Sequence, residues 1–193
     1  MHVHPGRALT IVMLAALVLV AAATDASARA GFYVGWGLAN QKPGGDLDGN
    51  TAPELEAGSG NAFRIGYGFS NDFGLEYWSV ASTHDQVDSS GTANYGYSTL
   101  ALRVSKAMGD SELFLRVGHT ALLGGHSLKF AGASTKFTGD GPSFGAGLEY
   151  MFARLGIELS YTLHDVDLKH QKSDQELDVV ASTVLLVFSF YFR

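Results

Sequence analysis

The chain has 193 residues, of which 46% are hydrophobic and 24 are glycine, with four prolines and no cysteine. The length suits one domain, and without cysteine no disulfide holds the fold together. The formal net charge of −6 argues against nucleic acid as a partner, because phosphate binding requires a basic face.

Residues 1–30 have the organisation of an export signal. Arg7 gives a positive start, residues 8–23 are apolar, and Ala28-Arg29-Ala30 (or Ala26-Ser27-Ala28) has the small-x-small pattern of a cleavage site. An uncleaved membrane anchor is the alternative, but the apolar stretch is short and small residues follow it directly. We expect removal of residues 1–30, which leaves residues 31–193 as one domain.

Residues 31–193 alternate in polarity at period two, the pattern of β-strands. The sequence predicts eight strands, over residues 31–40, 61–70, 73–82, 95–106, 112–123, 142–152, 155–164 and 176–193. Short turns alternate with long polar segments, which we interpret as loops over residues 41–60, 83–94, 124–141 and 165–175. Within the third loop, residues 128–130 and 136–138 are compatible with extensions of the neighbouring strands.

The last segment organises the predicted fold. Val184, Leu186, Phe188, Phe190 and Phe192 fall on one side at period two. The apolar run is too short for a membrane helix, which needs about 20 residues, and its β-branched and aromatic residues favour a strand. A terminal strand of this kind must pair on both edges. We therefore expect it to close a β-barrel against the first strand.

The polar face of the strands decides between two kinds of barrel. A soluble, lipocalin-like barrel points its apolar face inward, whereas a membrane barrel points it toward lipid. Here the polar face is mostly Gly, Ala and Ser with isolated charges, unlike a surface in water. We predict that six charged residues form a network inside a sealed barrel, three positive and three negative: Arg64, Glu76, Arg103, Arg116, Glu149 and Glu158. Opposite charges would balance there, because an unpaired buried charge is costly.

Aromatic residues gather near the predicted short turns. Belts of aromatic residues mark the membrane interface of such barrels, although aromatics also favour strands in general. We predict a membrane-interface belt of six: Phe32, Phe69, Phe73, Phe152, Phe190 and Phe192.

Four stretches carry a resemblance to a known family: GFYVGWGLAN, FRIGYGFSNDFGLEYW, FGAGLEYMFARLGIELSY and VFSFYF. With their order and the loop alternation, residues 31–193 resemble the small eight-stranded outer-membrane barrels of Gram-negative bacteria, of the OmpA/OmpX type. The resemblance implies an outer-membrane location, insertion by the outer-membrane assembly machinery, short periplasmic turns and four loops facing outward. Family members usually end on Phe, whereas this chain ends Phe192-Arg193.

For such a barrel we favour a non-enzymatic, monomeric surface protein without a cofactor. Its loops would contact host molecules, lipopolysaccharide or neighbouring cells, or the barrel would support membrane integrity. Three of the four loops are acidic and residues 124–141 are net basic. No peptidoglycan-binding domain is expected after the last strand.

An enzyme acting on outer-leaflet lipid is the second hypothesis, since barrels of this size include lipid A deacylases and acyltransferases. A serine hydrolase needs a histidine within reach of its serine. His119, His126 and His164 lie near the outward strand ends, but adjacent His126 and Ser127 would point to opposite faces of a strand. The His-x-Ser pattern is absent, and His84 and His170 show no metal-ligand spacing. We expect the histidines at the surface.

A small gated pore is the third hypothesis. Eight strands leave an interior only wide enough for side chains, whereas porins use about 16–18 strands. Conduction would therefore require rearrangement of the interior charge pairs.

Overall fold

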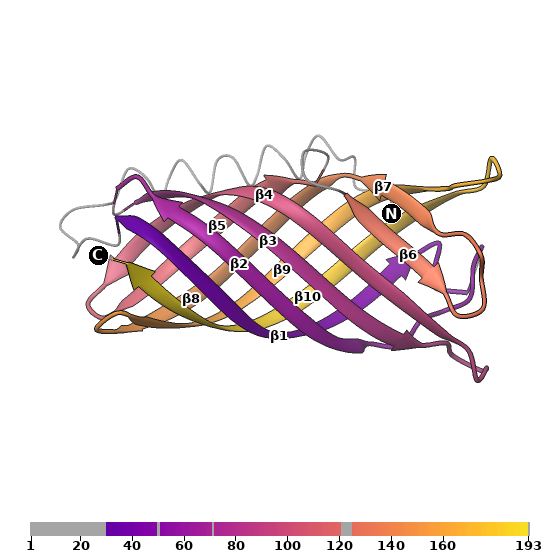
Figure 1. Cartoon of the computed structure of the whole chain (residues 1–193), viewed down its shortest axis with the longest axis horizontal. Helices are drawn as coiled ribbons and strands as arrows, with labels where there is room; N and C mark the ends of the chain where they lie inside the picture. The colour runs from indigo at the N-terminus through magenta and orange to yellow at the C-terminus, as the bar shows by residue number, and fades with distance from the viewer. Residues whose placement is uncertain (1–29, 50, 71, 121–124, 193) are drawn as a thin grey trace, which may run out of the picture.

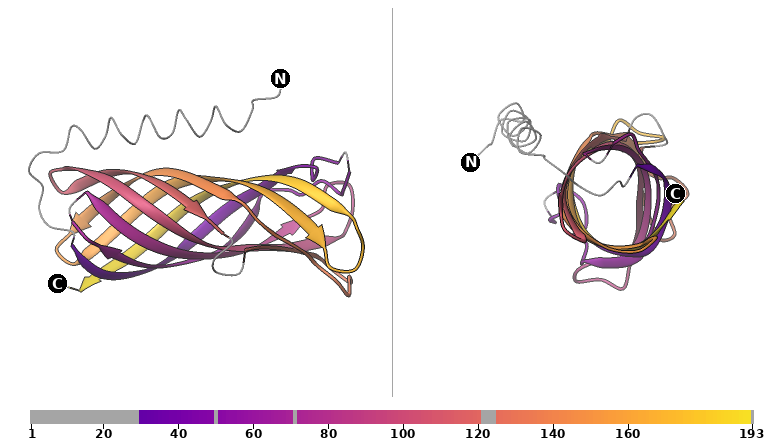
Figure 2. Two further views of the ribbon diagram at one scale, coloured as in Figure 1. Left: turned by 90° about the horizontal axis from the view of Figure 1, so that it is seen from above. Right: turned by 90° about the vertical axis from the view of Figure 1, so that its left-hand side faces the viewer.

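A computed structural model describes residues 30–49, 51–70, 72–120 and 125–192. Apart from Ala30, the predicted signal peptide lies outside these residues. The described chain forms a closed, elongated cylinder of antiparallel strands (Figure 1), and the end-on view in Figure 2 shows the continuous ring. No helix among the described residues is long and apolar enough to cross a membrane.

The ring has eight strand positions, two of which are each occupied by two consecutive strands. β5 and β6 both pair with β4, while β7 and β8 both pair with β9. The strands of the described chain are β1 (Gly31–Gly45), β2 (Gly58–Gly68), β3 (Phe73–Asp85), β4 (Thr92–Met108), β5 (Ser111–His119), β6 (His126–Phe130), β7 (Phe137–Asp140), β8 (Pro142–Phe152), β9 (Leu155–His170) and β10 (Glu176–Phe192).

β1 and β10 close the ring, which confirms the predicted pairing of the first and last strands. Their register runs from Phe32 opposite Phe192 to Gly45 opposite Val179. Two edges that would otherwise offer unpaired backbone groups are thereby satisfied. β10 also pairs along its other edge with β9, so it has a neighbour on each side.

Small residues let bulky side chains lie flat inside the narrow barrel. Gly66 on β2 is the clearest case, because a Cβ added there would lie 2.2 Å from the ring of Tyr33. Any larger residue would displace that ring from the inner wall. Glycine is thus required by the close approach of a neighbouring side chain.

The strands extend beyond their predicted ends. The prediction stops short because the polarity of each face of a strand reverses along its length. On β9, Leu159, Tyr161 and Leu163 point outward, and beyond them the outward residues become Asp165, Asp167 and Lys169. The inward residues change in the opposite sense, from Glu158 and Ser160 to the fully buried Val166 and Leu168.

The predicted loops 41–60, 83–94 and 165–175 are therefore corrected. Much of each belongs to a strand, and the connections shrink to residues 46–57, 86–91 and 171–175. A membrane barrel is expected to have an apolar outer surface, so the sequence analysis interprets a segment with polar residues at the outward positions as a loop. The suggested extensions at residues 128–130 and 136–138 do fall largely within β6 and β7.

The β1–β2 connection, described over residues 46–49 and 51–57, contributes to an apolar core at one end of the barrel, which we call the capped end; the opposite end has the short turns. Leu47 and Leu55 from this connection are completely buried. Leu55 bridges to Gln86, and the Glu56 amide donates to the Asp85 carbonyl at 2.8 Å. Together with inward residues of the strands, including Leu128, Leu168, Leu177 and Val179, they form an apolar core inside the capped end.

Candidate functional site: the barrel interior

Charged side chains fill the half of the interior nearest the short turns. The structure places all six predicted interior charges there, each at most 4% exposed: Arg64, Glu76, Arg103, Arg116, Glu149 and Glu158. They come from β2, β3, β4, β5, β8 and β9 at inward positions. Residues distant in sequence therefore meet only because the sheet closes.

Each guanidinium contacts several carboxylates. Arg64 donates to Glu149 at 2.9 Å and to Glu76 at 3.3 Å, and it also pairs with Glu158. Arg103 lies 3.0 Å from Glu76 and 2.7 Å from Glu149. Such charge-assisted hydrogen bonds offset part of the cost of burying ions.

Arg116 completes the network from β5. It donates to both oxygens of Glu158, at 2.7 and 2.6 Å, and its Nε also pairs with Glu76. Its guanidinium lies 4.3 Å from the centre of the Trp78 ring and 4.5 Å from that of Phe114. Both rings therefore pack against the cations of the network.

Tyrosines bound the network on the side of the short turns. The Tyr33 hydroxyl donates to Glu76 at 2.6 Å and the Tyr191 hydroxyl to Glu149 at 2.9 Å. The two rings stack with centroids 4.8 Å apart. Because they come from β1 and β10, they link the network across the closing seam of the barrel.

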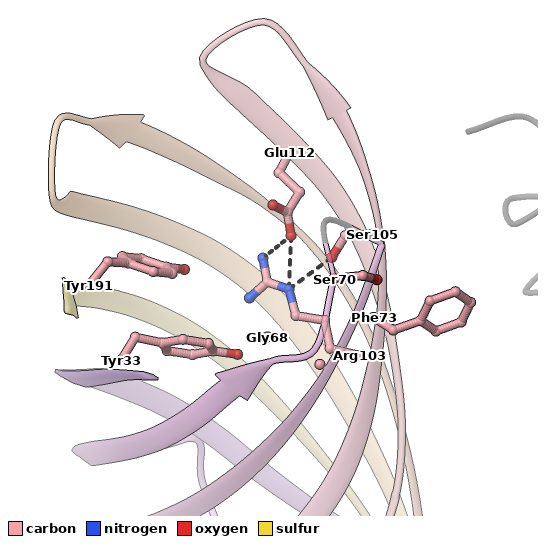
Figure 3. Close-up of a pocket in the computed structure, with 9 residues that line it drawn as sticks. Tyr33, Gly68, Ser70, Phe73, Arg103, Ser105, Glu112 and Tyr191 are labelled. Atoms are coloured by element: carbon pink, nitrogen blue, oxygen red, sulfur yellow. Dashed lines mark hydrogen bonds and ion pairs between the residues drawn. The ribbon is translucent and has the colours of Figure 1, made fainter. Parts of the chain in front are cut away.

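The sequence interpretation misses a fourth interior carboxylate, Glu112. It is 2% exposed, and its Oε1 accepts from Arg103 at 2.7 and 3.0 Å, beside Ser105 (Figure 3). The expected balance of three positive and three negative charges is thus incomplete. Glu112 lies two residues before Phe114 and four before Arg116, so it has the same inward phase. The predicted network leaves it out because it is the first residue of its predicted strand.

Three histidines are buried, contrary to the expected surface positions. His84, His126 and His164 are each at most 1% exposed and point inward, where they pack against Tyr95 or Tyr97 of the apolar core. The rings of His126 and His164 are 5.0 Å apart, and Tyr97 packs against both. His84 and His126 fall in predicted loops, whereas His164 is the last residue of its predicted strand and shares the inward phase of Glu158.

His164 is unusual among these residues. Neither of its ring nitrogens forms a hydrogen bond within the described chain, and His126 Nε2 is also without one. His126 Nδ1, by contrast, is 2.6 Å from the Tyr95 hydroxyl. Buried polar atoms without partners cost folding free energy.

Ser82 and His84 form a serine–histidine pair that the sequence analysis does not predict. Ser82 Oγ is 2.8 Å from His84 Nε2, and His84 Nδ1 is 2.9 Å from the Glu56 carbonyl. Burial lowers the pKa of the His84 imidazole. However, both side chains face the barrel interior and are at most 5% exposed. Among the described residues there is likewise no group of three or more His, Asp or Glu side chains able to hold a metal ion.

The predicted belt of phenylalanines lies outside the barrel at the end with the short turns. All six side chains are between 37 and 70% exposed: Phe32, Phe69, Phe73, Phe152, Phe190 and Phe192. Figure 3 shows Phe73 pointing away from the interior. Phe32 and Phe192 pair across the seam with ring centroids 5.5 Å apart. Tyr67 and Tyr150, which the prediction leaves out, are also exposed near this end.

Comparison with known proteins agrees with this architecture. The sequence model of a family described as "Outer membrane protein beta-barrel domain" matches residues 11–192. The chain belongs to this outer-membrane barrel family. Its location is the bacterial outer membrane, and the apolar outer wall below the polarity reversal is the surface that faces lipid.

Two solved structures share the fold of this outer-membrane barrel. Neisserial surface protein A is similar with a TM-score of 0.60 and 15% identity, over 86% of this chain and 100% of that one. Ail, the attachment invasion locus protein of Yersinia pestis, is similar with a TM-score of 0.54 and 20% identity, over 84% and 99%. Ail has also been solved in complex with the heparin analogue sucrose octasulfate. No curated protein matches the chain in sequence.

The geometry disfavours a passage through this outer-membrane barrel. One obstruction is the ion-paired network with Trp78 and Phe114 against it, and the other is the apolar core of the capped end, which includes Leu47 and Leu55. A hydrated path would require both to rearrange at once. The small cavity between them, beside Tyr97, Thr99 and Arg116, has a volume of about 10 Å³, which suits about one water molecule.

Proposed function

We propose that this protein is a non-enzymatic surface protein that contacts molecules outside the cell through the rigid capped end of its barrel. The short turns then lie in the periplasm, as in the proteins that the sequence resembles. The phenylalanine belt anchors the barrel at the periplasmic interface of the membrane, and the charge network holds the cylinder closed from within. Insertion by the outer-membrane assembly machinery and a monomeric state belong to the same proposal.

The reversal of polarity along β9 and β10 is the observation that supports this role most strongly. On β10, Val184 and Leu186 point toward lipid, whereas Asp178 and Glu176 point outward beyond it. Inside, Leu177, Val179 and Ala181 are fully buried at the same height. The capped end is thus a packed structure outside the lipid, which a barrel serving only to span the membrane would not require.

The outward residues of the capped end are rich in carboxylates. Asp178 lies opposite Asp167 in the β9–β10 register, and its backbone amide donates to Asp46 at 2.9 Å. Partial burial, together with the charges of Asp165, Asp167 and Asp46, raises the pKa of the Asp178 carboxyl. This face would attract cations or basic partners.

Ail has been solved with a heparin analogue, a polyanion that this carboxylate-rich face would repel, so heparin serves as the contrast to a basic ligand. Bacteria displaying this protein would be applied to surfaces coated with heparin or with basic extracellular-matrix proteins. On the basic proteins we expect adhesion above that of cells carrying an empty vector. Replacing outward Asp85, Asp165 and Asp167 with serine would reduce this adhesion while leaving the inward residues intact.

The control for this experiment is Arg154→Ser in the β8–β9 turn, at the opposite end of the barrel. It should bind like the wild type. If displaying cells adhere no better than vector cells on every surface, while deletion of the protein makes cells permeable to dyes, a role in membrane integrity would replace the proposal.

A further inference from the structure

A hollow on the outside wall of the barrel crosses β2, β3, β4 and β6. Its floor is a row of short outward residues that the strand register places side by side: Asn61 is opposite Ala81, Ala81 opposite Gly96, and Gly96 opposite Ser127. The hollow encloses about 530 Å³, a size typical of small-molecule sites.

Hydrogen-bonding groups line the side of the hollow nearest the capped end. Two residues further along each strand toward the capped end, the register places Ser59, Thr83 and Asn94 side by side in a second row. The Thr83 hydroxyl donates to Asn94 Oδ1 at 3.0 Å, which leaves the two N–H donors of the Asn94 amide directed elsewhere. The lining therefore offers hydroxyl and amide groups suited to the oxygens of a sugar.

Two lysines supply positive charge at this hollow. Lys129 on β6 and Lys136 in the β6–β7 connection both line it, and among the described residues no Asp or Glu does. Lys129 is next to Asn94 in the register. By contrast, Lys169 on β9, opposite Thr138 of β7 in the register, is bonded to Glu176 at 2.7 Å. On a chain with a net charge of −6, this concentration of cations favours an anionic ligand.

The hollow lies where the lipid-facing surface ends. Phe63, two residues from Asn61 on the same face of β2, is 42% exposed, and neighbouring Leu38 on β1 is 53% exposed. Apart from Tyr95, the residues that line the hollow are small, polar or charged, which suits the depth of lipid headgroups, with an apolar wall directly beneath. A ligand with both a charged sugar and acyl chains fits this arrangement.

We propose that the hollow binds the phosphorylated saccharide headgroup of an outer-leaflet glycolipid. Lys129 and Lys136 pair with phosphate, the Asn and Thr side chains contact sugar hydroxyls, and the acyl chains lie along the apolar wall around Phe63. This inference is independent of the surface-contact function proposed above, since it concerns a lipid of the same membrane.

The test uses the full barrel in nanodiscs and fluorescent lipopolysaccharide as the probe. We expect saturable binding that weakens about tenfold or more in a K129E/K136E variant, because each cation near an anionic lipid surface contributes measurably. Ala81→Trp, which fills the hollow without changing charge, should weaken binding comparably. K106E/R154E, at the short-turn end of the barrel, changes the charge by the same amount as K129E/K136E and is the control that should bind like the wild type.

Two further probes separate the possible ligands. Enzymatically dephosphorylated lipopolysaccharide should bind the wild-type protein as weakly as intact lipopolysaccharide binds K129E/K136E. Soluble sucrose octasulfate, if it binds wild type tightly while lipopolysaccharide does not, would assign the hollow to a sulfated glycan and overturn the proposal. Equal binding of lipopolysaccharide by wild type, K129E/K136E and Ala81→Trp, each shown to be folded by its heat-dependent gel mobility, would also overturn it.

Discussion

Arg64 on β2 and Glu158 on β9 are 94 residues apart in the chain and form an ion pair inside the barrel, where both side chains are 0% exposed. The pair exists only in the closed ring, because β2 and β9 are separated by β1 and β10 on one side. Interior charge and barrel closure therefore depend on each other.

Replacing Arg64 with methionine should destabilise the barrel by about 3–5 kcal/mol, since three buried carboxylates would each lose a partner. Urea unfolding of the refolded protein in detergent micelles, followed by tryptophan fluorescence, measures this loss. Arg154→Met, in an exposed turn, is the matched control. Equal midpoints for the two variants would show that the network contributes nothing to stability.

The apolar core of the capped end should be as sensitive as that of a soluble protein. Leu168 is completely buried, so Leu168→Ala should cost about 2–5 kcal/mol, whereas Asp167→Ala on the adjacent outward position should change little. Limited proteolysis of whole cells would detect the loosened end as new cleavage. Similar resistance of both variants would mean that the extension is not packed.

His164→Leu should stabilise the barrel by roughly 1 kcal/mol or more, because it removes two buried nitrogens that have no hydrogen-bond partner. The thermal midpoint of the gel-mobility shift gives the measurement. His170→Leu serves as contrast, because its ring bonds to Thr135 and Ser173 at 2.6 and 2.7 Å. A lower midpoint for His164→Leu than for wild type would contradict the prediction.

Asp178 should make stability depend on pH. Its folded-state pKa is raised by partial burial and by neighbouring aspartates, so its contribution is fully present below the unfolded pKa of about 3.9 and is lost as pH rises through the folded value. Asp178→Asn should therefore raise the thermal midpoint at pH 7 and have no effect near pH 3. The same comparison with Asp174→Asn in the exposed β9–β10 turn should show no such difference. If Asp178→Asn changed the thermal midpoint by the same amount at pH 7 and pH 3, titration of Asp178 would be excluded as the cause of the change.

Cysteine labelling can map the boundary of the membrane, because the chain has no cysteine of its own. A membrane-impermeant maleimide on intact cells should label Thr83→Cys, which lies in the polar outer wall, and leave Phe63→Cys unlabelled. Both native side chains are exposed on the outside of the barrel, so the difference reports lipid rather than protein burial. Labelling of both positions would place the membrane lower on the barrel.

The ring and its contents follow from periodicity over the lipid-facing strands. Glu158, Ser160 and Thr162 alternate with Ile157, Leu159 and Tyr161, so both the strand and its inner face are legible in the sequence. The rest of β9 is not, because the polarity of each face reverses at Asp165 while the phase stays the same. Alternation alone identifies a strand. To decide which face points inward, one must also know whether lipid or water surrounds that part of the barrel.

The same reversal explains the error on the histidines. His164 shares the inward phase of Glu158 and is the last residue of its predicted strand, next to Leu163, the last apolar outward residue. His84 and His126 similarly lie at strand ends whose extent depends on pairing with distant strands. Glu112 was missed at the opposite end for a related reason, since strand boundaries are the least certain part of such patterns.

At the capped end, the residues that stabilise the fold are different from those that contact the surroundings. On β9 and β10, one set of residues fills the core and the intervening set meets the surroundings. Outward positions can therefore be exchanged one by one at little expense to folding. If the capped end faces outward, as proposed, the surface that the cell displays is free to vary on a backbone that stays the same.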